Sequence, residues 1–252
     1  MVHIILSGCA GKMGNVIASI VALRSDCKIV AGVDLVIPKD SAFPVYNDLN
    51  NVLEHADVIV DFSHPSALSG ILNFAENRKM PTVIATTGLN NEQIALIKET
   101  SKEIPVFFTF NMSLGVNLLA ELAKKAASVL GDGFDIEIIE SHHNQKIDAP
   151  SGTALMLAEA ITETLDGNYS YEYDRHAKRQ KRDKKEIGIH TIRGGTIVGE
   201  HEIVFAGRDE IIMLSHSARS KEIFAVGSIN AALFLYNKSK GLYNMGDLVA
   251  SK

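Results

Sequence analysis

The first 110 residues of this 252-residue chain alternate between short apolar runs and helix-like segments, and this alternation limits the possible folds more than any other feature. The apolar runs are rich in β-branched residues and end at polar residues or glycine, as buried strands do. They lie at residues 2–6, 28–34, 56–62, 80–87 and 104–110, and the helix-like segments between them lie at residues 13–25, 65–78 and 90–103. Such alternation predicts a doubly wound parallel α/β sheet with helices on both faces.

Ligands of doubly wound sheets bind at the carboxyl ends of the strands. The loops that follow the five apolar runs are therefore expected to line one crevice. These loops read SGCAGKMG, VDLV, DFSHPS, ATTGL and TFNMS.

The first of these loops has the composition of a phosphate-binding turn. Gly8, Gly11 and Gly14 lie between the first strand and the first helix, where glycine permits close backbone approach and free N–H groups attract phosphate. The G-x-x-G-x-x-G spacing alone is also compatible with a tight turn that binds nothing. Asp34, which ends the second strand, favours a dinucleotide because an acid at this place accepts hydrogen bonds from ribose hydroxyls.

The second half of the chain has a different pattern. Residues 113–131 predict an amphipathic helix, and residues 134–144 predict an alternating strand. Residues 186–207 and 209–218 alternate strictly around glycine turns, which favours antiparallel strands with one open face. We therefore expect an α+β region here, after which residues 221–249 return to an apolar helix that can pack on the first domain.

Composition excludes several classes of partner. The formal net charge is −5, whereas nucleic acids and anionic membranes bind clustered positive charge. The run at residues 177–186 holds six Lys or Arg but no aromatic residue, which favours a solvated loop over a nucleic-acid patch. The chain shows neither a membrane-length apolar segment nor an export signal, and its two cysteines form no disulfide or zinc pattern. We expect a globular protein of the reducing cytoplasm.

The stretch ESHHNQKIDAPSGTA, residues 140–154, carries too many polar groups for an ordinary core strand. It leads into a helix at residues 148–165, whose first N–H groups near Gly152 and Thr153 can face a carboxylate. Lys146 can supply a positive charge and a proton, and His142 and His143 should point to opposite sides of an extended chain. A single histidine is usually an ordinary hydrogen-bonded residue, but this combination indicates a site. A metal centre is disfavoured, because adjacent histidines rarely chelate one ion.

Taken together, several motifs resemble the 4-hydroxy-tetrahydrodipicolinate (dihydrodipicolinate) reductase family, and the similarity runs from near residue 2 to near residue 250. These motifs are GCAGKMG, DFSHP, ATTG, FNMSLGVN, ESHHNQKIDAPSGTA and IRGGTIVGEH. The resemblance implies a Rossmann-type domain at residues 1–112, completed by residues 220–252, and an inserted substrate-binding and oligomerisation domain at residues 113–219. It also implies NADH- or NADPH-dependent reduction of a cyclic imine dicarboxylate in lysine and diaminopimelate biosynthesis, by a homotetramer.

The resemblance also assigns roles residue by residue. It makes His142 a proton donor or acceptor, Lys146 the proton donor, and His143, Gly152 and Thr153 substrate-binding residues. The cofactor-binding positions that it implies are Gly8, Cys9, Ala10, Gly11, Lys12, Met13, Asp34, Ala85, Thr86, Thr87, Thr109, Phe110, Asn111 and Met112. These roles fit the chemistry, since hydride addition beside an imine builds negative charge that a cation stabilises and a proton quenches.

Three positions depart from the family pattern. Ala85 stands where many members have glycine, the basic loop lacks a glycine and a spaced arginine, and Leu35 stands where some members have an arginine for the NADPH 2′-phosphate. Because Asp34 repels that phosphate and only Lys12 is placed to offset it, we expect NADH to bind at least as well as NADPH.

Two other hypotheses remain open from sequence. An aspartate or homoserine dehydrogenase would use a similar cofactor domain but would not need the His-His-x-x-Lys block. A catalytically silent NAD-sensing protein would be expected to lack His142 or Lys146, and both are present.

Overall fold

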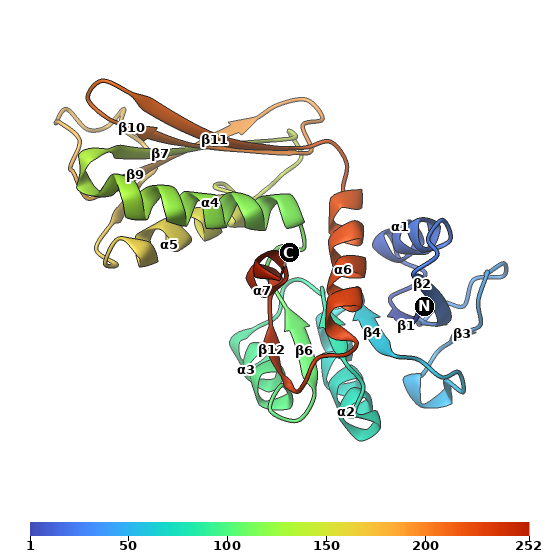
Figure 1. Ribbon diagram of the computed structural model, residues 1–252. Coiled ribbons are helices and arrows are strands. Elements are labelled where there is room, and N and C mark those ends of the chain that lie inside the picture. The colour runs from blue at the N-terminus through green and yellow to red at the C-terminus, as the bar shows by residue number, and fades with distance from the viewer. Residues whose placement is uncertain (252) are drawn as a thin grey trace. The chain divides into compact units, whose positions relative to one another are not determined.

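The computed structural model describes residues 1–251, which divide into two compact units. The first unit contains residues 1–114 and the chain from Glu222 onward, and the second contains residues 115–221. Figure 1 shows both units. Within residues 1–251, no helix has the length and apolar character needed to span a bilayer.

The first unit is built on a seven-stranded sheet in which every neighbouring pair of strands is parallel. The strand order is β12-β6-β5-β4-β1-β2-β3. From β1 the sheet grows to one side through β2 and β3, and β4 then starts the other side, so the strand order reverses between β1 and β4. The strands are β1 Val2–Ser7, β2 Cys27–Val33, β3 Val45–Tyr46, β4 Val58–Asp61, β5 Thr82–Ile84, β6 Pro105–Phe108 and β12 Gly241–Tyr243. The predicted doubly wound parallel sheet is confirmed, and β3 and β12 are short edge strands that the apolar pattern did not reveal.

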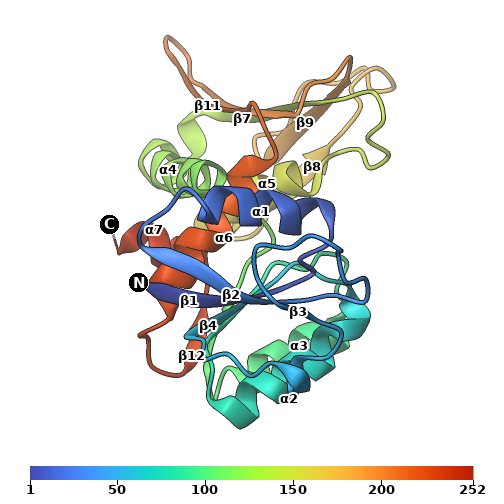
Figure 2. The same ribbon diagram turned by 90° about the vertical axis from the view of Figure 1, so that its right-hand side faces the viewer.

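Helices cover both faces of this sheet (Figure 2). One face carries α1 (Lys12–Val21), α6 (Glu222–Leu235) and α7 (Met245–Ala250), and the other carries α2 (Leu68–Arg78) and α3 (Asn91–Thr100). Strand β1 supplies both cores, because Ile4 and Leu6 point to the α1 and α6 side while Ile5 points to the opposite face. Two 3₁₀ turns, η1 (Leu49–Asn51) and η2 (Pro65–Ala67), lie in the connections after β3 and β4.

The second unit has a five-stranded sheet in the order β11-β10-β7-β9-β8. Its strands are β7 Asp135–His142, β8 Ser170–Glu172, β9 Glu186–Arg193, β10 Gly199–Ala206 and β11 Ile211–Ala218. Helices α4 (Leu114–Leu130) and α5 (Gly152–Thr164) pack their apolar side chains on one face, and η3 (Gly131–Gly133) joins α4 to β7. This is the α+β architecture expected from the pattern change after residue 112.

The pairing within this sheet differs from the expected run of antiparallel strands. β10 is antiparallel to β11 and β7, but β9 is parallel to β7 and to β8. β7 lies between β9 and β10, so the two strands joined by the Gly194–Gly195 turn are not neighbours. The inward isoleucines Ile136 and Ile138 of β7 are buried in the core of this unit, together with the inward residues of β9 and β10.

The basic run at residues 177–186 is mostly exposed, as expected for a solvated loop, but some of its side chains also bind neighbouring strands. The guanidinium of Arg182 donates to the Glu137 side chain at 2.9 Å and to the Ile136 carbonyl at 2.7 Å, and Lys178 pairs with Glu172. These contacts bind the loop to β7 and β8. Its positive charge is thus partly neutralised within the second unit.

Candidate active site

A cavity of about 560 Å³ opens in the first unit at the carboxyl ends of β1, β2 and β4. The loops after these three strands line it, together with a segment at residues 47–50 that sequence reasoning missed. The expected loops after β5 and β6 do not contribute to its wall. The lining includes Ser7, Gly8, Gly11, Asp34, Leu35, Asn47, Asn50, Phe62, Ser63, His64 and Gly70.

The glycine loop is shaped for close backbone approach. Gly8 has φ +77°, a left-handed conformation that favours glycine, and an added Cβ there would lie 2.6 Å from the Phe62 carbonyl oxygen. A Cβ on Gly14 would lie 2.3 Å from the Gly8 carbonyl oxygen. No side chain caps α1 at Gly11, so the amino end of that helix remains available to a phosphate.

Asp34 has a second role that sequence reasoning missed. Its Oδ2 accepts a hydrogen bond from the Ala10 N–H at 2.9 Å, and its Oδ1 accepts one from the Val36 N–H at 3.2 Å. The carboxylate therefore fixes the glycine loop while it lines the cavity. Each oxygen retains acceptor capacity for a ribose hydroxyl, because an ionised carboxylate has about four lone-pair sites.

The other expected cofactor positions do not line the cavity. The side chains of Cys9, Ala85, Thr86 and Met112 are buried, and burial together with the charge of Asp34 raises the pKa of the Cys9 thiol to about 11. Thr86 donates to the buried Asp61 carboxylate at 2.7 Å. Those positions can meet a ligand only through backbone groups, whereas Lys12 and Phe110 are exposed.

The second unit contains a polar cluster built on β7. Along this strand the inward positions are Ile136, Ile138, Glu140 and His142, since alternate residues share one face. The face that begins as an apolar core thus ends in an acid and an imidazole. His142 is 8 % exposed, and His143, the first residue beyond the strand, is partly exposed.

Glu140 is fully buried and accepts hydrogen bonds from three neighbouring segments. Arg193 of β9 donates to both carboxylate oxygens at 2.8 Å, in a two-pronged arrangement. Thr191 and the Ser151 N–H each donate at 3.0 Å, and His142 Nδ1 lies 2.6 Å from Oε2. Burial raises the pKa of Glu140, but these donors more than offset it and hold the pKa at about 2.

The protonation of His142 follows from this arrangement. Because ionised Glu140 only accepts hydrogen bonds, Nδ1 of His142 must carry a proton. Burial lowers the pKa of His142, and although Glu140 opposes this shift, the charges of Lys146 and Arg193 reinforce it. At neutral pH the imidazole is therefore neutral, with an unprotonated Nε2. A Cβ added to Gly199 would lie 3.1 Å from that nitrogen, so only glycine leaves the ring this position.

The segment after His142 is tied to the turn between β9 and β10. The Gly194 N–H donates to the His142 carbonyl at 2.9 Å, and the Asn144 N–H donates to the Gly195 carbonyl at 3.2 Å. Lys146, whose side chain is 22 % exposed, pairs with Asp148 at 2.9 Å, and this hydrogen bond lowers the pKa of Asp148. The ammonium is thus present in the cluster and held by a carboxylate.

The start of α5 contributes the remaining groups. Ser151 caps the helix by accepting from the Ala154 N–H at 3.1 Å, and its hydroxyl also lies 3.0 Å from His201 Nε2. Burial and the nearby His142 lower the pKa of His201 to about 4, so this second imidazole is also neutral. Gly152, the first helical residue, is exposed, and Thr153 is partly exposed.

Sequence reasoning predicted His142, Lys146 and Gly152 but missed Glu140, Ser151, Arg193 and His201. A signal for Glu140 existed, because it lies two residues before His142 on a predicted strand and must share its face. No local signal joins Glu140 to Arg193, which is 53 residues away.

Comparison with known proteins agrees with this geometry. The family model described as "Dihydrodipicolinate reductase, N-terminus" matches residues 2–112, and that described as "Dihydrodipicolinate reductase, C-terminus" matches residues 115–249. The chain belongs to this family. The family prediction is confirmed, and the first unit is a Rossmann-type dinucleotide-binding domain.

Relatives within the family are similar over their full length. A 4-hydroxy-tetrahydrodipicolinate reductase of Caldanaerobacter subterraneus is 52 % identical, covering 99 % of this chain and 98 % of the relative. One of Clostridium novyi is 45 % identical and covers 100 % of both chains. The solved structure of a dipicolinate-bound dihydrodipicolinate reductase from Paenisporosarcina sp. TG-14 superposes with a TM-score of 0.78, at 26 % identity and 97 % coverage of each chain.

The low pKa of Glu140 predicts a specific acid sensitivity. The pKa is about 2 in the folded chain and about 4.3 when unfolded, so the carboxylate stabilises the fold above pH ~4.3 and this contribution is lost as the pH falls through 2. Glu140→Gln should lower the free energy of unfolding at pH 7 by roughly 3 kcal/mol and flatten its decline between pH 4.3 and 2. Denaturant unfolding at several pH values measures both effects.

Glu163→Gln is the matched control, because Glu163 is an exposed acid on α5. It should leave the pH dependence unchanged. Parallel curves for the Glu140→Gln variant and the unsubstituted protein would contradict this account of the buried carboxylate.

Proposed function

We propose that this chain catalyses the NAD(P)H-dependent reduction of 4-hydroxy-tetrahydrodipicolinate to tetrahydrodipicolinate, on the route to diaminopimelate and lysine. The main support is the 52 % identity, over 99 % of the chain, to a relative named for this activity. The polar cluster of the second unit supplies groups of the kind that such a reduction needs. An aspartate or homoserine dehydrogenase is disfavoured by membership of the reductase family.

The first unit fits a dinucleotide cofactor. Its cavity lies where parallel sheets bind nucleotides, Gly8 and Gly14 allow the tight backbone packing of the loop that lines it, and Asp34 faces the same space. We infer that backbone groups of residues 8–13 receive the phosphates and that Asp34 receives a ribose. Residues 85–87 and 109–112 complete the proposed site, the buried ones through their backbone and the exposed Thr87 and Phe110 also through their side chains. A bound reduced nicotinamide supplies the hydride.

In the second unit we assign carboxylate binding to Lys146, His143 and the first turn of α5 at Gly152 and Thr153. The Asp148 carboxylate already forms an ion pair with the Lys146 ammonium at 2.9 Å, so a substrate carboxylate has to compete with Asp148 for that ammonium. The dicarboxylate ligand of the Paenisporosarcina relative supports an anionic substrate of this size.

Proton transfer can be divided between two side chains. Lys146 carries protons that it can donate to the negative charge left by hydride addition. His142 has no proton on Nε2 at neutral pH, since Nδ1–H is directed to Glu140. We therefore assign the donor role to Lys146, which protonates the ring after hydride addition. The free Nε2 of His142 can accept a ring C–H proton and pass it to the 4-hydroxyl that leaves as water, with Glu140 fixing the tautomer.

Lys146→Ala and His142→Ala should each lower kcat by about 10² to 10⁴, which is the usual contribution of a positioned acid or base. Lys146→Ala should also raise the substrate KM, because a carboxylate contact is lost. Turnover is followed by NADH absorbance with substrate generated by the preceding synthase, and NADH affinity is measured separately and should survive.

Lys184→Ala, at an exposed lysine of the basic loop, is the control. Near-normal kcat in both site variants, with folding intact, would contradict the assignment, and no turnover by the unsubstituted protein would favour an NAD-sensing role.

Asp34 should determine the choice between NADH and NADPH. Its carboxylate lines the cavity beside Leu35, which is 93 % exposed and offers no charge to a 2′-phosphate. We expect NADH to bind at least as well as NADPH, with repulsion on the order of 1–3 kcal/mol. Asp34→Asn keeps one acceptor oxygen but removes the charge, so it should improve NADPH relative to NADH. An NADPH KM more than tenfold below that for NADH in the unsubstituted protein would refute this role.

We also propose that four copies associate through the five-stranded sheet. The sheet face opposite α4 and α5 has no helix on it within residues 115–221, and Ile211 and Met213 of the edge strand β11 are 63 % and 58 % exposed. Apolar side chains on an open sheet edge favour association. Light scattering at micromolar concentration should give four times the monomer mass of 27.4 kDa, and a monomer would exclude the proposal.

A further inference from the structure

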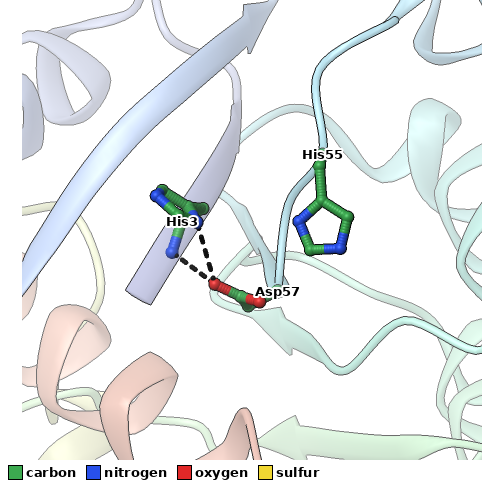
Figure 3. Close-up of side chains that lie close together, drawn as sticks. All are labelled: His3, His55 and Asp57. Carbon is green, nitrogen blue, oxygen red and sulfur yellow. Dashed lines mark hydrogen bonds and ion pairs between the residues drawn. The ribbon is translucent and has the colours of Figure 1, made fainter. Parts of the chain in front are cut away.

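A second group of metal-ligating side chains lies in the first unit, away from the cavity. Figure 3 shows His3 on one side of the Asp57 carboxylate and His55 on the other. One potential ligand atom from each residue lies within 4.8 Å of the other two. Nδ1 of His3 lies 3.3 Å from Oδ2 of Asp57.

The fold holds two of these residues in register. The Asp57 N–H donates to the His3 carbonyl at 2.8 Å, and the His3 N–H donates to Asp57 Oδ2 at 2.7 Å. These bonds join the first residues of β1 to the segment that enters β4. They also orient the carboxylate, as outer hydrogen bonds do in metal sites. His55 lies two residues before Asp57, in the segment that enters β4.

We propose that His3, His55 and Asp57 bind a divalent transition-metal ion, with Zn²⁺ as the representative ion. Tetrahedral ligands about 2.0 Å from zinc are about 3.3 Å apart, which matches the separation of His3 Nδ1 from Asp57 Oδ2. His55 is exposed and is free to adjust its side-chain rotamer by the remaining distance. Two imidazoles and one carboxylate suit Zn²⁺, Ni²⁺ and Cu²⁺ but not Mg²⁺, and water completes the coordination.

The site is separate from the proposed reaction. His3 is the second residue of β1, and Ser7 at the other end of the strand lines the cavity, so about 13 Å of strand separates them. A bound ion would instead link β1 to the entry of β4 and stabilise the first unit against unfolding. Lys28 is paired with His3 across β1 and β2 and is exposed, so its charge opposes binding.

The distance in sequence explains why no metal site was predicted. His3 and Asp57 are 54 residues apart, and only parallel pairing of β1 with β4 brings them together. The pair His55 and Asp57 alone is too common a pattern to indicate a ligand set.

The test is titration of the chelator-treated full-length protein with Zn²⁺ by calorimetry, and with Co²⁺ by visible absorption. We expect one ion per chain, tetrahedral Co²⁺ bands, and a rise in Tm with Zn²⁺ but not with Mg²⁺. His55→Ala and Asp57→Asn should each weaken this binding at least tenfold. His55 is exposed, so its removal should leave the fold intact, and Asn at position 57 keeps an acceptor for the His3 N–H.

His176→Ala is the matched control. It also removes an exposed histidine, but one that lies in the second unit, so the Zn²⁺ affinity should not change. Lys28→Gln should tighten binding. Equal Zn²⁺ affinity in the unsubstituted protein and the His55→Ala variant would overturn the proposal, as would the absence of a stoichiometric site. Neither outcome depends on reductase activity, so failure here would leave the proposed function intact.

Discussion

The ion pair between Glu140 and Arg193 determines the arrangement of the second unit's polar cluster. A fully buried carboxylate is costly unless its lone pairs are satisfied, and here β9, the start of α5 and His142 itself all supply donors. Because the donors come from β9, from the start of α5 and from β7 itself, the carboxylate brings these three segments to one point. Loss of Arg193 would remove the charged partner of a fully buried carboxylate, which is strongly destabilising. The dense polar content of residues 140–154 is therefore a structural requirement as much as a chemical one.

The first unit uses a carboxylate in a similar way. Asp34 accepts from the backbone of the glycine loop and thereby shapes the turn whose cavity it also lines. In both units an acidic side chain holds nearby backbone and side-chain donors in place before any ligand binds. Preorganisation of this kind reduces the ordering cost of binding.

Sequence alone predicted the features that depend on short-range periodicity. The parallel sheet follows from apolar runs separated by helical segments, and His142 and Lys146 could be proposed because their motif is compact. The missed features depend on contacts between distant segments. The place of β7 between β9 and β10, the Glu140 to Arg193 pair, and the contribution of residues 47–50 to the cavity all require the tertiary fold. The segment at residues 47–50 had no apolar pattern at all, since it reads NDLN.

The buried thiol within the glycine loop has a consequence for the chemistry of the cell. Thiolates, not thiols, react with peroxides and electrophiles, and a pKa of about 11 leaves about one Cys9 side chain in 10⁴ ionised at pH 7. Cys9 is also 4 % exposed, so an oxidant can barely reach it. The Cys9 thiol therefore lies in the loop proposed to hold the phosphates without being a ready target for oxidants. Oxidative damage to this loop would then have to begin at a side chain other than Cys9, and Met13 is the partly exposed sulfur of the same segment.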